Sequence, residues 1–352
     1  MEIVHASQSR LEQVDFDNLG FGRIFSDHMF MADYRNGAWQ SMRITPYGNI
    51  EIPPSLCSLH YGQAIFEGLK AFRTLDGEIS LFRPDKYQER FNRSGSRLCI
   101  PPVSKELFME AVLGLCRIDR EWTPKKRGSS LYIRPFIFAA DSFLGVHAAD
   151  SYIFMVITSP VAAYYKEGIN PVRLITSGEY VRAVKGGLGE AKTPANYAAS
   201  LLPAEKAQQQ GFTQVLWLDA IEKKYVEEVG TMNIMFLIGG ELVTPPLDGA
   251  TLGGVTRLTV LELAAYWGTP VKERRVAIDE VLARAKDGSL REVFGTGTAA
   301  VISPVGLIRH GDETITINEG RIGPFSQKLY DEITGIQYGE RRDRFGWLYP
   351  AA

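Results

Sequence analysis

The stretch RAVKGGLGEAKTPANYAAS, residues 182–200, combines a glycine-rich turn, a lysine and the signals that open a helix. Thr193 is a suitable N-cap and Pro194 occupies the favoured first helical position, so we expect a helix over 194–210. Lys192 lies at this loop-to-helix junction, where the positive end of the helix disfavours an ammonium group. Only a neutral amine attacks an aldehyde, which makes Lys192 a candidate for Schiff-base chemistry. Taken alone, a lysine in such a place is more often an ordinary surface residue.

Outside this stretch the sequence predicts more strands than helices. Apolar and β-branched runs predict strands at 130–138, 152–158, 172–177, 213–218, 224–229, 232–238, 241–244, 291–294 and 299–303. Apolar periodicity and end signals, such as the N-cap candidate Ser104, predict helices at 86–98, 105–118, 256–267, 278–287 and 325–337. Because strands and helices do not alternate strictly, we expect an α+β fold rather than a doubly wound sheet.

The length of 352 residues favours two domains. A polar stretch bracketed by Ser159-Pro160 and Pro171 predicts a linker at 161–171. We therefore expect a small N-terminal α/β domain over 1–160 and a large C-terminal domain over 172–352.

The composition is that of an ordinary folded protein, with 45% hydrophobic and 23% charged residues and a formal net charge of -2. Nucleic acids and anionic membranes select basic surfaces, so neither is an expected partner. The three cysteines follow no zinc or CxxC spacing, which favours free thiols in a reducing compartment. With no apolar run of about 18 residues and no signal-peptide core, we expect a cytoplasmic protein.

Metal and hydrolytic chemistry find no support in the sequence. The five histidines are scattered, none at ligand spacing from another histidine or a cysteine, so no metal site is expected. Neither a GxSxG nor a Walker pattern is present. A pyridoxal-phosphate site needs an acid for the pyridine nitrogen, a donor to the ring hydroxyl, a phosphate cup and an anchor for the substrate carboxylate. Candidates for all four exist.

The candidate acids are Glu227 and Glu228, which alternation in a predicted strand points to opposite faces. One of the two faces the core, where a protonated pyridine would compensate its charge. The alternative is a strand-end acid paired with Lys223 or Lys224.

Two glycine turns are candidates for binding phosphate through backbone N–H groups. Leu252–Thr256 opens a predicted helix, and Gly295–Ala299 interrupts a predicted strand. Either turn alone is more often structural.

Together these segments resemble the branched-chain amino-acid aminotransferases, fold-type IV pyridoxal-phosphate enzymes of the class IV aminotransferase family. The resemblance covers about residues 19 to 340. Besides the lysine segment, the motifs that carry it are YGQAIFEGLKAF (61–72), LFRP (81–84), YIRP (132–135), LGV (144–146), EVGTMN (228–233), VFGTGTA (293–299) and IQYG (336–339).

The resemblance implies roles for the residues around the cofactor, pyridoxal 5'-phosphate, which it places between the two domains. Lys192 would form the Schiff base and move the proton between Cα and C4′. Glu228 would partner the pyridine nitrogen, and Tyr197 would donate to the ring hydroxyl. The phosphate would be held by Arg90, Gly254, Val255, Thr256, Gly297 and Thr298.

The resemblance also implies a substrate site. Tyr132 and the backbone of Thr298 and Ala299 would anchor the substrate carboxylate, and Arg134 would receive the distal carboxylate of glutamate. An apolar pocket would be lined by Phe21, Tyr61 and Phe66, with Thr231 as a further substrate contact.

The implied reaction is a ping-pong transfer of the amino group from L-leucine, L-isoleucine or L-valine to 2-oxoglutarate, by a homodimer whose partners are small molecules. The chain departs from its relatives at Thr193–Ala195, where two glycines are usual, and at the pocket loop Ala139–Phe143. It also lacks the CxxC that some animal relatives carry after the Gly-Thr-Ala turn. Two rivals remain: an enzyme of the same fold acting on D-amino acids, amines or aminodeoxychorismate, and a catalytically silent scaffold protein.

Overall fold

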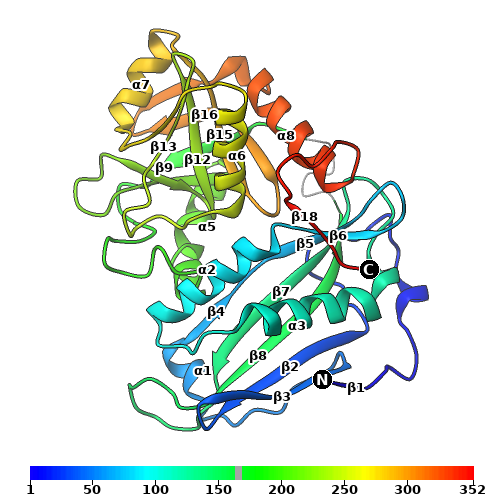
Figure 1. Ribbon diagram of the computed structural model, residues 1–352. Helices are drawn as coiled ribbons and strands as arrows, with labels where there is room; N and C mark the ends of the chain where they lie inside the picture. The colour runs from blue at the N-terminus through cyan, green and yellow to red at the C-terminus, as the bar shows by residue number, and fades with distance from the viewer. Residues whose placement is uncertain (163–168) are drawn as a thin grey trace. The chain divides into compact units, whose positions relative to one another are not determined.

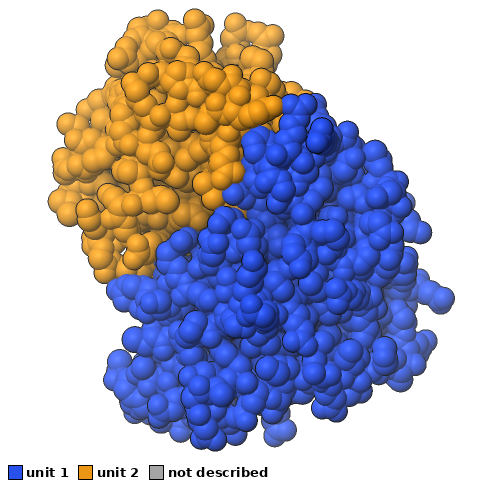
Figure 2. Space-filling view, viewed as in Figure 1, with its two compact units in different colours: residues 1–166, 191–194, 335–352 blue, residues 167–190, 195–334 orange. Residues whose placement is uncertain are grey.

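A computed structural model describes residues 1–162 and 169–352 of the chain, so residues 163–168 of the expected linker 161–171 lie outside the described residues. The chain folds into two compact units, coloured blue and orange in Figure 2. Unit 1 comprises Met1–Lys166, Ala191–Pro194 and Gly335–Ala352, and unit 2 comprises Glu167–Glu190 and Ala195–Thr334.

The expected domain ranges, 1–160 and 172–352, stay a prediction, and the compact units depart from them at the C-terminus. β18 (Leu348–Pro350) pairs antiparallel with β6 (Ile79–Phe82). This pairing joins Gly335–Ala352 to unit 1 rather than to unit 2.

Unit 1 is built on a nine-stranded sheet with the order β1-β3-β2-β8-β7-β5-β6-β18, in which β4 also pairs with β7. Its other strands are β1 (Glu2–Ile3), β2 (His28–Arg35), β3 (Ala38–Pro46), β4 (Ala64–Phe66), β5 (Leu69–Arg73), β7 (Ser130–Ala139) and β8 (Tyr152–Val161). The predicted strands at 130–138 and 152–158 are confirmed as β7 and β8. The hairpin of β2 and β3 was not predicted, although Asn36 (φ 54°) and Gly37 (φ 79°) form the Asn-Gly pair that favours a tight hairpin.

Helices α2 (Pro84–Arg97) and α3 (Lys105–Ile118) of unit 1 confirm the two predicted there, and α1 (Cys57–Tyr61) adds a short third. Ser104 caps α3 as predicted, because its hydroxyl accepts a hydrogen bond from Leu107 N at 3.1 Å. Figure 1 shows α2 and α3 beside the sheet, where the unit has its aromatic core. In that core Phe154 of β8 packs against Phe30, Phe91 and Phe108, with ring centroids 5.4, 5.6 and 6.4 Å away.

Unit 2 contains a second nine-stranded sheet, ordered β11-β10-β9-β16-β15-β12-β13-β14, with β17 paired to β16. An additional pairing between β11 and β12 connects the path back on itself, so that β11, β10, β9, β16, β15 and β12 form a closed ring. The strands are β9 (Val172–Thr176), β10 (Gln214–Leu218), β11 (Val226–Val229), β12 (Met232–Ile238), β13 (Glu241–Thr244), β14 (Val271–Glu273), β15 (Leu290–Gly297), β16 (Val301–His310) and β17 (Glu313–Thr316). The mixture of antiparallel and parallel pairs with separate helices confirms the expected α+β class.

The helices of unit 2 differ from the prediction at one place. The predicted helix over 194–210 is two helices, α4 (Pro194–Ala198) and α5 (Leu201–Gln209). Pro203 explains the break, since proline clashes with the carbonyl of residue i−4 in a continuous helix but fits the first turn of a new one. The remaining helices follow the prediction closely: α6 (Val255–Tyr266), α7 (Ile278–Lys286) and α8 (Pro324–Gln337), the last of which ends in unit 1.

Candidate functional site

Backbone hydrogen bonds fix the candidate lysine on unit 1. Phe66 N donates to the carbonyl oxygen of Lys192 (3.0 Å), and Lys192 N donates to the hydroxyl of Ser94 in α2 (2.9 Å). The hydroxyl of Thr193, the expected N-cap, donates to the carbonyl oxygen of Ala64 (2.8 Å). The lysine Nζ lies 4.9 Å from the centre of the Phe66 ring. Lys192 is therefore held beside β4 with its amine over an aromatic face.

Side chains on the half-exposed face of β7 lie next to Phe66. Tyr132 and Arg134 alternate with buried residues on that strand, and Arg134 Nη2 donates to Tyr132 Oη at 2.9 Å. The guanidinium carbon of Arg134 lies 4.7 Å from the Phe66 ring centre, and the Phe21 ring meets the Tyr132 ring edge-on at 5.0 Å. A Cβ at Gly68 would lie 1.9 Å from Tyr132 Oη, so this packing requires glycine. Four of the predicted substrate residues thus form one chain of contacts that begins at the lysine.

Arg90 has a partner that the sequence did not reveal. From α2 its Nε and Nη2 donate to the two carboxylate oxygens of Glu67, at 2.7 and 2.8 Å, and both side chains are buried. Glu67 also accepts from Gly68 N at 3.0 Å. Such a two-bond pair between a guanidinium and a carboxylate is strong and directional, so Arg90 is held in one orientation.

Of the two candidate acids in unit 2, Glu228 is the buried one, with 3% of its surface exposed. Its Oε1 accepts from Leu252 N (2.8 Å) and from the side-chain amide of Asn233 (3.2 Å), and its Oε2 lies 3.1 Å from Arg182 Nε. The alternative pairing with Lys223 or Lys224 is therefore wrong, because the cation at Glu228 is Arg182. Arg182 belongs to the opening sequence stretch, yet no spacing or periodicity connected it with β11.

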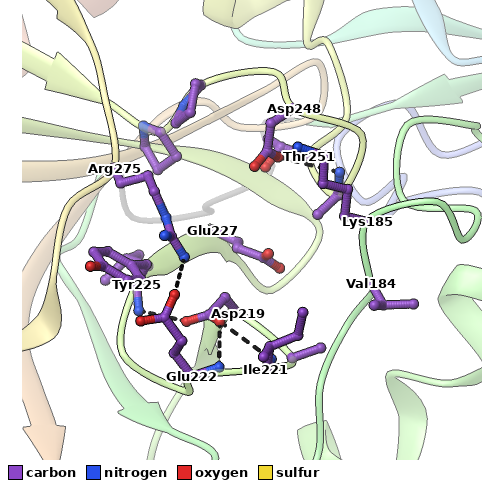
Figure 3. A pocket seen from close by; sticks show the side chains of 15 residues that line it. Val184, Lys185, Asp219, Ile221, Glu222, Tyr225, Glu227, Asp248, Thr251 and Arg275 are labelled. Carbon is purple, nitrogen blue, oxygen red and sulfur yellow. Dashed lines mark hydrogen bonds and ion pairs between the residues drawn. The ribbon is translucent and has the colours of Figure 1, made fainter.

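Glu227 points to the other face of β11, which confirms the alternation predicted for the pair. It lines a pocket of about 310 Å³, shown in Figure 3, together with Asp219, Asp248 and Lys185. Burial raises the pKa of Glu227 to about 7, an effect that Arg182 opposes and that Asp248, Asp219 and Glu228 reinforce. The charged form of Glu227 is therefore disfavoured, and Glu228, which has Arg182 as its partner, is the better candidate for the fixed anion that a pyridinium needs.

The two predicted anion turns have features that fit a phosphate-bearing cofactor. At Gly254, which precedes α6, a Cβ would lie 2.0 Å from Asn233 Oδ1, so the close approach of Asn233 requires glycine there. Among the described residues, the hydroxyl of Thr296 is buried without a hydrogen-bond partner. Val301, just after the second turn, has a φ of 64°, which is rare for a β-branched residue and marks a strained backbone. An unsatisfied hydroxyl and local strain are what a bound anion would explain.

The other predicted site residues differ in how far they are exposed. Val255 and Thr256 begin α6 and are buried, while Gly297, Thr298 and Ala299 are half-buried at the end of β15 and in the turn that follows. Tyr197 is half-buried in α4, and Thr231 is exposed between β11 and β12. Tyr61 is 45% exposed at the end of α1, where its ring contacts His60.

Two features are absent from the described part of the chain. None of its helices combines the length and the hydropathy needed to cross a membrane. No group of three or more His, Cys, Asp or Glu side chains within it is placed to bind a metal ion.

Comparison with known proteins places these features in one family. Residues 64–308 match the family model described as amino-transferase class IV. Branched-chain-amino-acid aminotransferase 2 of Bacillus subtilis is 52% identical over 350 residues, which cover 99% of this chain and 96% of that protein. The branched-chain-amino-acid aminotransferase of Mycolicibacterium smegmatis is 46% identical over 337 residues, 94% of this chain and 92% of that protein.

Solved structures agree with the sequence relatives. The branched-chain amino acid aminotransferase of Escherichia coli superposes with a TM-score of 0.75 at 27% identity, covering 93% of this chain and 99% of that one. The T.th. branched-chain amino acid aminotransferase with pyridoxamine 5'-phosphate also gives a TM-score of 0.75, at 28% identity and with 91% and 98% covered. The chain therefore belongs to the class IV amino-transferase family and has its fold-type IV architecture.

Proposed function

We propose that this chain is a branched-chain-amino-acid transaminase, which transfers the amino group of L-leucine, L-isoleucine or L-valine to 2-oxoglutarate with pyridoxal 5'-phosphate as cofactor. Relatives that are about half identical over nearly the whole chain carry that name. The observation that carries the proposal is Glu228, a buried carboxylate fixed by Arg182, Asn233 and Leu252 N. A fixed buried anion is what a protonated pyridine nitrogen requires.

The residues of the chain would divide the work as follows. When bound, pyridoxal phosphate supplies an electron-withdrawing ring that makes the Cα proton of an attached amino acid acidic. Lys192 would hold the cofactor and then move that proton between Cα and C4′. Glu228 would keep a proton on the pyridine nitrogen, and Tyr197 would donate to the ring hydroxyl. The phosphate would be bound at these two turns by Gly254, Val255, Thr256, Gly297 and Thr298, together with Arg90, which Glu67 holds in one orientation.

The face of β7 suits two kinds of substrate in turn. Phe66 and Phe21 would contact a branched apolar side chain, with Tyr61 and Thr231 at the margin of the pocket. Tyr132 and the Thr298–Ala299 backbone would orient the carboxylate at Cα. Arg134, whose Nε is buried without a hydrogen-bond partner among the described residues, would bind the distal carboxylate of glutamate or 2-oxoglutarate.

We also infer a homodimer in the cytoplasm whose partners are amino acids and 2-oxo acids, and domain ranges of 1–160 and 172–352 joined by 161–171. Light scattering coupled to size-exclusion chromatography would test the dimer, since a monomeric active species would contradict it.

The test of the activity is a panel of L- and D-amino acids assayed with 2-oxoglutarate. We expect L-leucine, L-isoleucine and L-valine to be the fastest donors. One glutamate should form for each 2-oxo acid that is released. Faster reaction with D-amino acids or amines would favour the rival enzyme of the same fold. A purified protein without visible cofactor absorption and without turnover would favour the silent scaffold.

A further inference from the structure

The carboxylate of Glu228 is held from three sides by buried groups. Arg182, whose side chain is 7% exposed, lies against one oxygen, and Asn233 and Leu252 N donate to the other. Hydrogen bonds that involve a charged partner are shorter and stronger than neutral ones, so the side chain has one well-defined orientation. Nothing in the proposed roles above assigns a task to Arg182 or Asn233.

The same two residues also hold the turn that precedes α6. Asn233 Nδ2 donates to the carbonyl oxygen of Leu252 at 2.7 Å, so both backbone groups of Leu252 belong to the network. Arg182 Nη2 donates to the carbonyl oxygens of Ala250 and of Gly189, the latter at 3.2 Å. The carboxylate and the start of the turn Leu252–Thr256 therefore cannot move independently.

The network explains why position 189 in the glycine-rich run is a glycine. A Cβ at Gly189 would lie 2.2 Å from the Ala250 carbonyl oxygen, the same atom that Arg182 binds. The run lets the two loops approach closely enough for one guanidinium to bridge them. A lysine could supply the charge at Glu228 but could not reach three acceptors in one plane.

The positive charge of Arg182 also affects the basicity of Glu228. A cation 3.1 Å from a carboxylate makes that carboxylate a weaker base. A proton shared between Glu228 and a pyridine nitrogen would then stay on the nitrogen, where it is needed. Without the cation Glu228 would compete for the proton, and the electron-withdrawing power of the ring would fall.

We propose that Arg182 and Asn233 are positioning residues for amino transfer: Arg182 keeps Glu228 charged and weakly basic, and Asn233 sets the place of the phosphate turn relative to it. The inference rests on the proposed function, in which Glu228 faces the pyridine nitrogen. The two residues have different expected effects. Arg182 carries a charge and affects the basicity of Glu228, whereas the neutral Asn233 affects only the position of the turn.

The experiment compares Arg182→Gln, Arg182→Lys and Asn233→Ala with the full-length wild-type protein. Three quantities are measured: affinity of the cofactor-free protein for pyridoxal phosphate, the pH midpoint of the visible absorption of the loaded protein, and kcat with L-leucine. Arg274→Gln is the matched control, because it removes an arginine that pairs with Glu280 outside the network. We expect it to change none of the three.

For Arg182→Gln we expect the absorption midpoint to move to higher pH, since removal of a positive charge favours a bound proton. We expect kcat to fall about 10- to 100-fold, because Glu228 loses its ion-pair partner and competes for the pyridine proton. Arg182→Lys should restore the midpoint and most of kcat. Asn233→Ala should weaken cofactor binding about 3- to 10-fold, as for lost neutral hydrogen bonds, with the midpoint unchanged.

An unchanged midpoint in Arg182→Gln, or equal losses in the Gln and Lys variants, would overturn the proposal and leave Arg182 a structural brace. If Arg182→Gln does not fold, Arg182→Lys decides, because a shifted midpoint in a variant that keeps the charge would also overturn it. A wild-type protein that binds the cofactor but does not react with L-leucine would refute the proposed function instead. The binding and absorption comparisons would still judge Arg182 in that case.

Discussion

Glu227 offers a stability test that is independent of catalysis. The carboxylate lies on the pocket side of β11, and one of its oxygens is buried without a hydrogen-bond partner among the described residues. Burial raises its pKa from an ordinary 4.5 to about 7, with Arg182 opposing and Asp248 and Asp219 adding to the rise. Folding thus favours the protonated acid, and the charged form is tolerated at a cost.

The sign of the effect follows from proton linkage. Between pH 4.5 and about 7 the folded protein binds more protons at Glu227 than the unfolded chain, so the free energy of unfolding decreases as pH rises through this range. At ~1.4 kcal/mol per pKa unit, this shift in pKa would change the free energy of unfolding by roughly 3 kcal/mol if the group were fully buried. Because Glu227 is only half-buried, solvent screening reduces the expected effect to about 1–2 kcal/mol.

Glu227→Gln removes the charge and keeps the shape. We expect the variant to be more stable than wild type by about 1–2 kcal/mol at pH 8, with the difference vanishing near pH 4.5. Urea unfolding of both proteins at several pH values, followed by tryptophan fluorescence, measures this directly. Equal stability across the range, or a variant less stable at pH 8, would refute the reasoning.

Glu280 provides a control of opposite sign. Its pKa is lowered, chiefly by hydrogen bonds from Arg274, so its contribution is present above pH 4.5 and is lost as pH falls. Glu280→Gln should therefore destabilise the protein at pH 8. If removal of any carboxylate had the same effect, the free energy of unfolding at pH 8 would change in the same direction in both variants.

Four further outcomes are expected. Lys192→Ala should abolish the visible absorption of the lysine-bound cofactor and nearly all turnover, and near-normal turnover would reject the assignment. Glu228→Gln should lower kcat far more than cofactor affinity, whereas Glu227→Gln should stay active; the reverse pattern would mean that the wrong acid was chosen. Arg134→Gln should slow the single-turnover glutamate half-reaction about 10- to 100-fold and the leucine half-reaction much less. Equal decreases in both rates would indicate that Arg134 only stabilises its strand. Ser104→Ala should lower the free energy of unfolding by about 1 kcal/mol in denaturant titrations, through loss of the cap on α3; an unchanged value would contradict that cap.

Local signals in the sequence predicted local structure well. The cap at Ser104 and the proline at the start of α2 are properties of a few neighbouring residues, so the helices that they open could be placed from sequence alone. The break between α4 and α5 is equally local, since Pro203 marks it, but the prediction of one helix over 194–210 rested on the start signals at Thr193 and Pro194. The hairpin at Asn36-Gly37 was missed for the same reason, because its turn signal was not weighed against the surrounding pattern.

Long-range partners could not be predicted in this way. The family resemblance named Arg90 and Glu228 but not the residues that fix them, and each proved to be one half of a buried ion pair, with Glu67 and Arg182 respectively. No periodicity links the members of either pair, which lie on separate elements and meet only in the folded chain.

The two pairs share a physical logic. A buried charge without a partner is costly, and a partner of opposite sign both lowers that cost and fixes the side chain in one orientation. Under the proposed function Arg90 would bind a dianionic phosphate and Glu228 a cationic ring nitrogen, so without these partners each would be an isolated charge whenever the cofactor leaves. Glu67 and Arg182 let the cofactor-free protein keep both groups buried and oriented. They also weaken each group's hold on its ligand, because part of its field is already neutralised. Replacing Glu67 with Gln should accordingly lower the stability of the cofactor-free protein more than that of the loaded one, a difference that thermal unfolding with and without pyridoxal phosphate would measure. Equal losses in the two forms would contradict this reading of the pair.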